Sequence, residues 1–381
     1  MRRVRAAIGH GGGPTAVLNA SLAGVIDACR DRVDALFGAR FGVTGLLADD
    51  MADLLAISQW TVRSVARTPG SAIGSSRRSL DDGGYERLLA NLRARDVGVL
   101  FYTGGNGSME TALEISKRAR MIGYGLQVIG IPKTIDNDLL VTNHTPGYAS
   151  TGYFFACAAR DIGMDNRSLP SPICVLETLG RNAGWITAAT SLARTAPDDA
   201  PHLLYLPERP VSLDQIACDV EAVYRRLGRV VIAVCEGQRD EGGHPFGADV
   251  DRAGSGVHEL ASNLGHTLAR LISQKTGLRT RAEKPGLLGR TCGPFTRERD
   301  RREAYECGRA AVQAALSGQT DVMVALAVDS TTFLTPLETV ARVERVLPPE
   351  WIAPDGNDVT AAFRDYAAPL IGEVQGYGPM F

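Results

Sequence analysis

Short apolar runs alternate with longer segments of helical pattern along most of this chain. A parallel strand that is buried on both faces is a nearly continuous apolar run, and it needs a crossover helix to reach its parallel neighbour. The alternation therefore predicts an α/β fold with mostly parallel sheets. The strand-like runs are VRAAIGH (4–10), DVGVLFYTGG (96–105), LQVIGIPKT (126–134), SPICVLETLG (171–180) and RVVIAVCEGQ (229–238).

The chain is long enough for two domains. It has 381 residues, and a single hydrophobic core stops growing at roughly 250–300 residues. The pattern breaks in LLVTNHTPGYAST, near 140–150, and again in the Gly- and Pro-rich stretch near 284–296. Because Gly and Pro interrupt regular structure, we place hinges at these two stretches.

Composition excludes several classes of partner. A formal net charge of −2 leaves no basic footprint for nucleic acid. Seven Cys without a CxxC pair predict reduced core thiols, and hence a cytoplasmic protein. No apolar run approaches the roughly 20 residues of a membrane span, and the amino-terminal apolar stretch is too short for a signal peptide. We therefore expect no nucleic-acid partner and no membrane.

Four polar clusters directly follow predicted strands: GHGGGPT, TGGNGS, PKTIDND and CEGQ. In open α/β sheets, ligands bind beyond the carboxyl ends of the strands. We expect the four clusters to converge on one cleft.

Two of these clusters have the glycine-rich form of an anion-binding turn. Gly11–Gly13 precede a helix that contains Asn19, and Thr103–Ser108 precede another, with Ser108 placed to cap it. Backbone N–H groups at a helix amino terminus hold phosphates. The segment 74–78 adds Arg77 and Arg78, whose guanidinium groups suit phosphate. Taken singly, these features also fit an unliganded turn, an ordinary helix cap and a surface loop.

The segment from Lys133 to Asp138 has the side chains that phosphoryl transfer requires. Asp136 and Asp138 supply a general base and a possible magnesium ligand, while Lys133 and Thr134 lie beside them. Positioning and charge neutralisation carry most of that chemistry. A solvated acidic turn is the alternative for such a segment on its own.

Together, the motifs resemble the phosphofructokinase family. GGGPTAVLNA, GSSRRSL, TGGNGS, PKTIDND, LETLGRNAGW and CEGQ occur in that family's order, and the similarity continues to the end of the chain. It is closest to the short bacterial branch, whose members often use pyrophosphate. The resemblance implies two Rossmann-like three-layer αβα domains. Residues 1–147 plus about 292–340 would bind the phosphoryl donor, and 148–291 plus about 341–381 the sugar phosphate.

The resemblance also implies roles for individual residues. Asp136 would be the base, with Arg181 and Lys133 as the other catalytic residues. The donor would contact Gly12, Gly13, Arg77, Arg78, Gly105, Asn106, Gly107 and Ser108. The acceptor would contact Thr134, Asp138, Leu179, Gly180, Glu236, Lys284 and Arg290. Mg²⁺ would be held by Asn106 and Asp138.

The identity of the donor is left open between ATP and pyrophosphate. In the family, Asp at position 107 with Lys at 133 resembles the pyrophosphate enzymes, whereas Gly107 with Lys133 resembles ATP-using members. An absent side chain at 107 leaves room for a nucleotide, so we place ATP slightly ahead. Asn106 stands where many members have a magnesium-binding Asp, which weakens the expected metal site.

The acceptor is expected to be fructose 6-phosphate, although another sugar or sugar phosphate is open. The family's four phosphate-gripping positions correspond to Pro172, Lys284, Arg290 and Gly293, so two cations remain. Since family members complete this site from a neighbouring subunit, we expect a homodimer or homotetramer.

Two alternatives belong to other classes of protein. One is a catalytically weakened regulatory homologue, because Asn106, Pro172 and Gly293 depart from expected ligand positions. The other is a dinucleotide-dependent dehydrogenase, which rests only on the first glycine turn. That turn lacks the GxGxxG spacing, and no suitable acidic residue follows a second strand.

Overall fold

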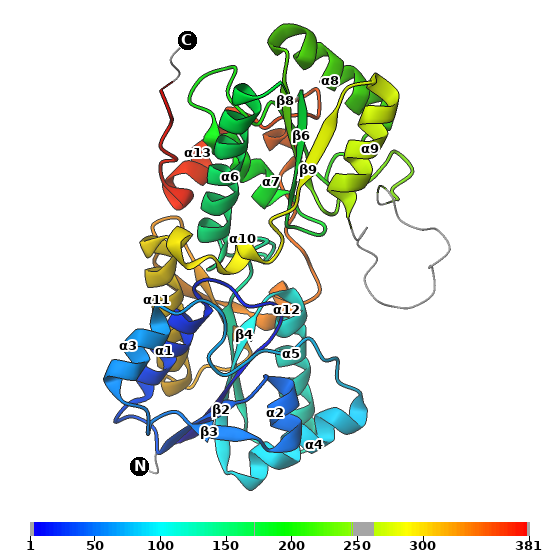
Figure 1. The fold of residues 1–381 in the computed structure, drawn as a ribbon. Coiled ribbons are helices and arrows are strands. Elements are labelled where there is room, and N and C mark those ends of the chain that lie inside the picture. Colours follow the sequence, from blue (N-terminus) through cyan, green and yellow to red (C-terminus); the bar gives the residue numbers. More distant parts are fainter. Residues whose placement is uncertain (1–3, 171, 245, 247–262, 379–381) are drawn as a thin grey trace. The chain divides into compact units, whose positions relative to one another are not determined.

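The computed structural model describes residues 4–170, 172–244, 246 and 263–378. These residues form two compact units, one of 1–148 plus 290–345 and one of 149–289 plus 346–381. Each unit is built on one sheet (Figure 1). Within the described residues, no helix is both long and apolar enough to cross a membrane.

The first unit contains a seven-stranded sheet in the order β11-β10-β5-β4-β1-β2-β3. Its four inner neighbour pairs are parallel, and only the two edge strands, β3 and β11, run antiparallel. The strands are β1 (Arg5–His10), β2 (Ala35–Ala39), β3 (Met51–Asp53), β4 (Val97–Gly104), β5 (Gln127–Pro132), β10 (Val322–Leu326) and β11 (Thr332–Pro336).

Helices cover both faces of this sheet (Figure 1). One face packs against α1 (Leu18–Cys29), α3 (Gln59–Ala66) and α11 (Glu298–Leu316). The other packs against α2 (Val43–Ala48), α4 (Asp82–Ala94), α5 (Asn106–Met121) and α12 (Leu337–Val340). The inner strands are therefore buried on both sides, as their apolar sequences require.

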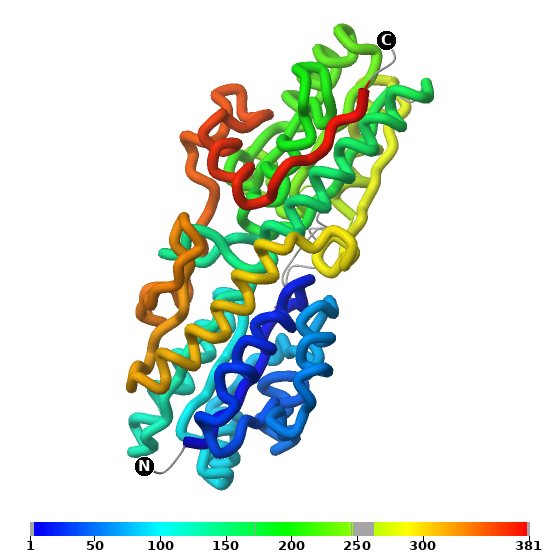
Figure 2. The backbone as a smooth tube through the Cα atoms, turned by 90° about the vertical axis from the view of Figure 1, so that its left-hand side faces the viewer, coloured from blue at the N-terminus to red at the C-terminus, as the bar shows by residue number. Residues whose placement is uncertain are grey.

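Helices α1 and α11 lie side by side (Figure 2) because each has a glycine at the contact. A Cβ on Gly24 would lie 2.1 Å from the Tyr305 carbonyl oxygen, and one on Gly308 would lie 2.1 Å from that of Ser21. Only glycine allows backbones this close. This packing fixes α11, whose buried acidic side chains contact the site described below.

The second unit contains a four-stranded, fully parallel sheet in the order β7-β8-β6-β9. Every residue of β6 and β8 is buried, which explains why β8 and the first four residues of β6 are apolar. The strands are β6 (Ile173–Thr178), β7 (Leu203–Tyr205), β8 (Val230–Cys235) and β9 (Thr280–Glu283).

The helices of the second unit again lie on both faces of its sheet. Apolar residues of α8 (Leu213–Leu227) and α9 (Leu264–Thr276) pack on one face, and Ile162 of α6 (Tyr148–Ser168) packs on the other. The carboxyl-terminal segment joins this unit through aromatic rings, with Trp185 5.9 Å from Trp351. The remaining elements are α7 (Trp185–Ala189), η1 (Thr190–Ala193), α10 (Leu288–Thr291), η3 (Gly293–Phe295), η4 (Pro349–Trp351) and α13 (Ala361–Ile371).

The two mostly parallel sheets confirm the predicted α/β fold class. The seven cysteines are free, and five of them are buried. Cys218 is exposed and Cys292 is half-buried, so the prediction of core thiols is wrong for these two. Cys218 lies on α8, an amphipathic helix whose outer face is exposed, and a cysteine there meets no apolar neighbour layer.

Candidate functional site

Three of the four polar clusters meet at one edge of the seven-stranded sheet. They follow β1, β4 and β5, which are adjacent parallel strands. Backbone hydrogen bonds join them: Gly11 N donates to Thr103 O (2.8 Å) and Lys133 N to Gly104 O (3.1 Å). The fourth cluster, CEGQ, follows β8 in the other sheet. Periodicity does not reveal which strands pair, so the sequence could not show this division, and the convergence of all four clusters on one cleft stays a prediction.

The first glycine turn does not open directly into a helix. Gly12 has a φ of +79°, which glycine adopts without strain, but α1 begins only at Leu18. Asn19, in the first turn of α1, instead binds the 68–72 segment, donating to Thr68 O (2.8 Å) and accepting from Ala72 N (2.7 Å). An anion at this turn would therefore be held by backbone groups and cations rather than by the α1 dipole.

Ser108 does not cap α5, contrary to the prediction. The helix begins at Asn106, so Ser108 lies inside its first turn and the N-cap is Gly105. Its hydroxyl occupies the space left by two glycines, since a Cβ on Gly11 or Gly104 would lie 2.2 or 2.0 Å from Ser108 Oγ. The serine thus packs the first two turns against each other.

A pocket of about 390 Å³ lies over the first glycine turn, and we call it the glycine pocket. Two guanidinium groups reach its floor: a Cβ on Gly13 would lie 2.7 Å from Arg290 Nη1 and 3.1 Å from Arg77 Nη2. Two cations beside a bare backbone suit a phosphate group. The lining residues are Gly12, Gly13, Pro14, Phe41, Ser71, Gly74, Ser75, Ser76, Arg77 and Arg290.

Two arginines that the sequence analysis assigned to substrates line different pockets. Arg290, expected at the acceptor phosphate, lines the glycine pocket with Arg77. Arg78, expected at the donor, lines a different hollow with Asp81 and Gly84. A backbone bridge between Gly11 and Ser76 marks extended chain here, in which consecutive side chains point to opposite sides. Arg77 and Arg78 therefore diverge.

Lys133 is buried beneath the first glycine turn, with 3% of its surface exposed. Its ammonium donates to the carbonyl oxygens of Gly11 (2.9 Å) and Gly13 (2.6 Å). Burial lowers its pKa to about 8, an effect that Asp136 opposes and Arg77 reinforces. The group is thus a cation at neutral pH, and an ammonium has a third N–H that can reach a ligand oxygen.

The loop after β5 holds Asp136 between two anchored neighbours. Asp136 N donates to Thr134 Oγ1 (3.1 Å), and the side-chain oxygen of fully buried Asn137 accepts from Thr145 N (3.1 Å). Asn137 has a φ of +54°, a conformation that asparagine tolerates better than most residues. Asp136 itself is half-buried. Asp136 is therefore presented on a turn with a defined geometry.

Asp138 and Asn106 form an oxygen-rich corner beside this turn. Asn106 Nδ2 donates to the Asp138 carbonyl oxygen (3.1 Å), whereas Asp138 Oδ1 and Asn106 Oδ1 are buried without a hydrogen-bond partner. Burial raises the pKa of Asp138; hydrogen bonds from Thr134 and Asn106 oppose the shift and Glu344 adds to it. Buried oxygens without hydrogen-bond partners can serve as ligands for a hard cation.

This corner fits Mg²⁺ as a partial ligand set. The described residues contain no cluster of three or more His, Cys, Asp or Glu side chains that could hold a metal. Mg²⁺ commonly takes one or two protein oxygens and fills its other positions with waters and substrate phosphates. Asp138 and Asn106 therefore suffice only in the presence of an anionic substrate.

In the second unit, the LGR and CEGQ segments follow adjacent strands β6 and β8 and lock together. Gly180 N donates to Glu236 Oε1 (3.2 Å), and Cys235 Sγ donates to Gly180 O (3.1 Å). A Cβ on Gly237 would lie 1.5 Å from the Arg181 carbonyl oxygen. Burial raises the pKa of Glu236, with the Gly180 hydrogen bond opposing the shift. Leu179, Gly180, Arg181 and Glu236 thus belong to one rigid corner.

Lys284 is paired with a carboxylate that the sequence analysis overlooked. Its ammonium lies 2.7 Å from Glu177 Oε1, and Glu177 is only 2% exposed. Glu177 Oε2 also accepts from Gly265 N (2.7 Å). A single acidic residue in the apolar run of β6 was the available signal, because a buried charge requires a partner.

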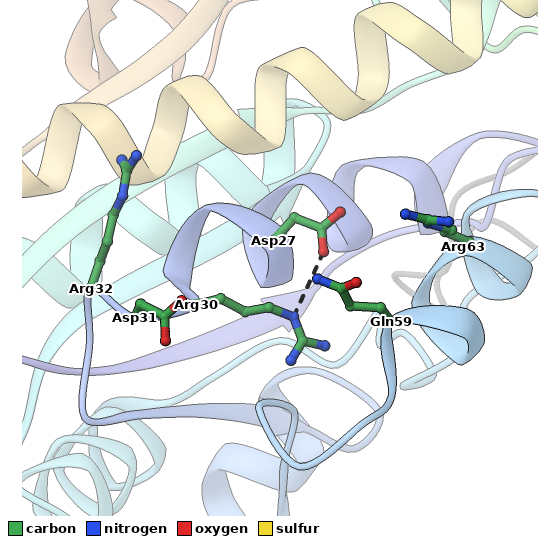
Figure 3. Close-up of a pocket in the computed structure, with 6 residues that line it drawn as sticks. All are labelled: Asp27, Arg30, Asp31, Arg32, Gln59 and Arg63. Atoms are coloured by element: carbon green, nitrogen blue, oxygen red, sulfur yellow. Dashed lines mark ion pairs between the residues drawn. The ribbon is translucent and has the colours of Figure 1, made fainter.

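A separate polar pocket of about 430 Å³ lies at the end of α1 and the start of α3 (Figure 3). Arg30 is held there by the Ile57 carbonyl oxygen (2.6 Å) and lies 3.8 Å from Asp27. None of its described lining residues lines the glycine pocket, so it is not part of the candidate site. It is lined by Asp27, Arg30, Asp31, Arg32, Gln59 and Arg63.

The geometry agrees with comparisons to known proteins. The family model described as Phosphofructokinase matches residues 5–315. The chain belongs to the phosphofructokinase family. This membership confirms the resemblance that the motifs indicated.

Relatives of this phosphofructokinase family member match it over nearly its whole length. The pyrophosphate–fructose 6-phosphate 1-phosphotransferase of Rhodospirillum rubrum is 38% identical, over 98% of this chain and 95% of the relative. The Xanthomonas campestris protein of the same description is 37% identical, over 94% and 90%. A solved pyrophosphate-dependent phosphofructokinase from Nitrosospira multiformis superposes with a TM-score of 0.89 at 31% identity, covering 100% of this chain and 94% of that one.

Proposed function

We propose that the protein is a pyrophosphate-dependent fructose 6-phosphate 1-phosphotransferase. One observation carries the proposal: buried Lys133 and the guanidinium groups of Arg77 and Arg290 gather at the first glycine turn, and the segment that supplies Lys133 continues to Asp136. An anionic donor would bind the three cations. The nearby carboxylate would act on the alcohol.

The reaction balances with the residues present. Asp136 accepts the proton of the sugar 1-hydroxyl as that oxygen bonds to a phosphorus atom of the donor. The bond between that phosphorus and its bridging oxygen breaks, and inorganic phosphate leaves. The products are a bisphosphorylated sugar and phosphate, and Asp136 later releases its proton to solvent. Lys133, Arg77 and Arg290 neutralise charge on the donor throughout.

Pyrophosphate is the donor we favour, which reverses the slight preference for ATP. Two relatives that match more than nine-tenths of this chain are described as pyrophosphate-dependent. Gly107 leaves open space, with no atom within 4 Å of a Cβ placed there. That space would admit a nucleotide but does not require one. The residue pair at 107 and 133 is therefore weaker evidence for ATP than the overall similarity to these relatives is for pyrophosphate.

Mg²⁺ is the metal we propose, held by Asp138 and Asn106 together with donor oxygens. When bound, it would neutralise part of the charge that develops on the phosphoryl group. Asp138 Oδ1 and Asn106 Oδ1, which lack hydrogen-bond partners, are the atoms available to it.

Several residues are proposed to bind the acceptor. In the second unit, Glu236 would accept hydrogen bonds from sugar hydroxyls, Arg181 would face charge on the transferring group, and Lys284 would meet the acceptor phosphate. Because Lys284 is already paired with Glu177, its attraction for that phosphate is reduced. In the first unit, Thr134 would contact the sugar. We also propose a homodimer or homotetramer, on family resemblance alone.

The deciding experiment compares donors. Initial rates are measured with fructose 6-phosphate and Mg²⁺, using pyrophosphate or ATP at matched concentrations. We expect kcat/KM with pyrophosphate to exceed that with ATP by about 100-fold, the order that a built polar site can discriminate. Greater activity with ATP would reverse the donor assignment. Absence of turnover with either donor over a panel of sugar phosphates would favour the alternative, a catalytically weakened regulatory homologue. Asn106, at a position where an Asp was expected to bind magnesium, is the residue that supports this alternative.

Donor binding should weaken as pH rises through about 8. Lys133 loses its proton there, because its pKa is lowered from 10.5 to about 8. The KM for pyrophosphate should therefore stay nearly constant from pH 6.5 to 7.5 and rise above pH 8. Loss of stability would not explain such a rise in KM. A lysine whose pKa is lowered in the folded state makes the free energy of unfolding increase as pH rises between about 8 and 10.5.

The matched control for this profile is Lys133→Met. It should have a higher KM at pH 7 and no inflection near pH 8, once the ionisation of free pyrophosphate is subtracted from both profiles. Identical pH profiles for the two proteins would contradict the assignment of Lys133 to the donor.

A further inference from the structure

Thr145 contacts the turn that presents Asp136 at two points. Its hydroxyl donates to the Thr134 carbonyl oxygen (2.9 Å), and its backbone N–H donates to Asn137 Oδ1 (3.1 Å). Thr134 and Asn137 flank Asp136 on either side. Thr145 is therefore one of the residues that set the position of the carboxylate, together with Asn106 and Arg345, which bind the Asp138 carbonyl oxygen.

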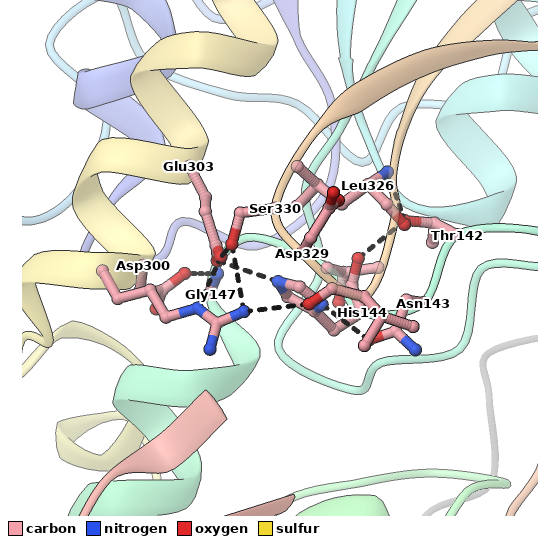
Figure 4. Close-up of polar contacts among 12 residues, drawn as sticks. Thr142, Asn143, His144, Gly147, Asp300, Glu303, Leu326, Asp329 and Ser330 are labelled. Atoms are coloured by element: carbon pink, nitrogen blue, oxygen red, sulfur yellow. Dashed lines mark hydrogen bonds and ion pairs between the residues drawn. The ribbon is translucent and has the colours of Figure 1, made fainter. Parts of the chain in front are cut away.

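Thr145 is held in turn by a buried contact between His144 and α11. His144 Nε2 lies 2.8 Å from Glu303 Oε2, and the two residues are 1% and 2% exposed (Figure 4). Three residues along, Gly147 N donates to Asp300 Oδ1 of the same helix (2.8 Å). Helix α11 thus binds the 142–147 segment at two points, one on each side of Thr145.

The Glu303 carboxylate is itself fully engaged. Its second oxygen accepts from Arg299 Nε (2.7 Å) and Ser330 Oγ (2.5 Å) (Figure 4). Burial alone would raise the pKa of Glu303, but the hydrogen bonds and charge of His144, with Arg299 and Ser330, lower it to about 2. The lowered pKa agrees with a carboxylate that accepts hydrogen bonds on both of its oxygens.

The start of the same segment is attached to the sheet. Thr142 Oγ1 accepts from Leu326 N (2.9 Å) at the end of β10, and Asn143 N donates to the Leu326 carbonyl oxygen (2.8 Å) (Figure 4). Two separate elements, α11 and β10, therefore fix 142–147. Buried polar networks of this kind restrict a segment to one geometry, because each group must keep its partner.

We propose that His144 and Glu303 are positioning residues for the Asp136 carboxylate, acting through Thr145 on the two residues that flank it. The inference rests on the proposed function of Asp136 and adds two residues that touch neither substrate. Their role is to keep the base within the few tenths of an ångström that proton transfer tolerates.

The first test compares His144→Ala with His144→Gln, because a glutamine amide can still donate toward Glu303. We expect His144→Ala to lower kcat about 10- to 100-fold, the order expected for a base misplaced by about 1 Å. The KM for pyrophosphate should stay within about twofold, since the glycine pocket is untouched. His144→Gln should recover kcat to within about threefold of the unaltered protein.

A second pair of variants keeps the test decisive if His144→Ala does not fold. Thr145→Val preserves side-chain shape but removes the hydroxyl that binds Thr134, and Thr145→Ser retains that hydroxyl. We expect kcat to fall about tenfold in the valine variant and to stay within about threefold in the serine variant. Asp358→Asn is the matched control, because it weakens the ion pair with Arg194 in the second unit (2.6 Å) and should leave kcat unchanged.

The outcomes separate this inference from the proposed function. If Asp136→Ala abolishes turnover while folded His144→Ala and Thr145→Val both keep kcat within twofold, the positioning role is wrong and the function stands. The positioning role is also wrong if His144→Gln and the control Asp358→Asn both change KM and kcat together. That pattern would indicate a general loss of stability. If Asp136→Ala itself retains full activity, the proposed function fails first.

Discussion

Replacing Asp136 with alanine is expected to lower kcat by about two to four orders of magnitude, as removal of a general base usually does. The fold should persist, because Asp136 is half-buried and the turn is held by Thr134, Asn137 and Thr145. Steady-state kinetics with fructose 6-phosphate, pyrophosphate and Mg²⁺ give the measurement. The KM for the donor should change little, since the donor's cations lie on Lys133 and the glycine pocket.

Two controls make this result specific. Asp136→Asn keeps the shape of the side chain but cannot accept the proton, so it should be as slow as the alanine variant. Asp355→Asn changes an exposed carboxylate in the second unit and should leave kcat unaltered. Pyrophosphate binding, measured by calorimetry, should survive in both Asp136 variants. Full activity in either of them would remove the base from the mechanism.

The sequence predicted the fold class because its signal is local. Short apolar runs such as those in β6 and β8 are typical of strands buried on both faces, and the helical segments between them supply the crossovers that parallel strands need. Strand partnership has no such local signal. The sequence therefore predicted the strand before CEGQ, but it could not show that this strand, β8, belongs to the smaller sheet.

Backbone direction was the harder part of the site. Gly11–Gly13 correctly indicated a tight turn, but no feature of the neighbouring sequence shows that α1 begins only at Leu18. Ser108 has the composition of a cap, yet it fills a gap left by Gly11 and Gly104, glycines that are distant in the sequence. Only tertiary structure brings such residues together.

Charge partners were the part least accessible to sequence. Arg290 and Lys284 were both expected at an acceptor phosphate, and nothing in the sequence indicated that Arg290 lies beside Gly13 or that Lys284 pairs with Glu177. The distances that decide such pairings join segments more than a hundred residues apart. The His144–Glu303 contact is of the same kind, since it spans 159 residues.

Gly237→Ala is expected to have the second-largest effect, because it would place a Cβ 1.5 Å from the Arg181 carbonyl oxygen. Backbone cannot yield as a flexible side chain can, so the CEGQ and LGR segments must separate. The free energy of unfolding should fall by about 1–3 kcal/mol, as overpacking usually costs. Displacing Arg181 and Glu236 by about 1 Å should also lower kcat about 100-fold.

The matched control for Gly237→Ala is Gly83→Ala, which adds the same methyl group in α4, where a Cβ meets no atom within 4 Å. That variant should gain about 0.5–1 kcal/mol in the free energy of unfolding, because alanine is the better helix former, and should keep full activity. Urea denaturation and steady-state kinetics on both variants give the two quantities. If Gly237→Ala matched Gly83→Ala in free energy of unfolding and in kcat, the close packing of the CEGQ and LGR segments would be wrong. The inference that this packing holds Arg181 in place for catalysis would then fail as well.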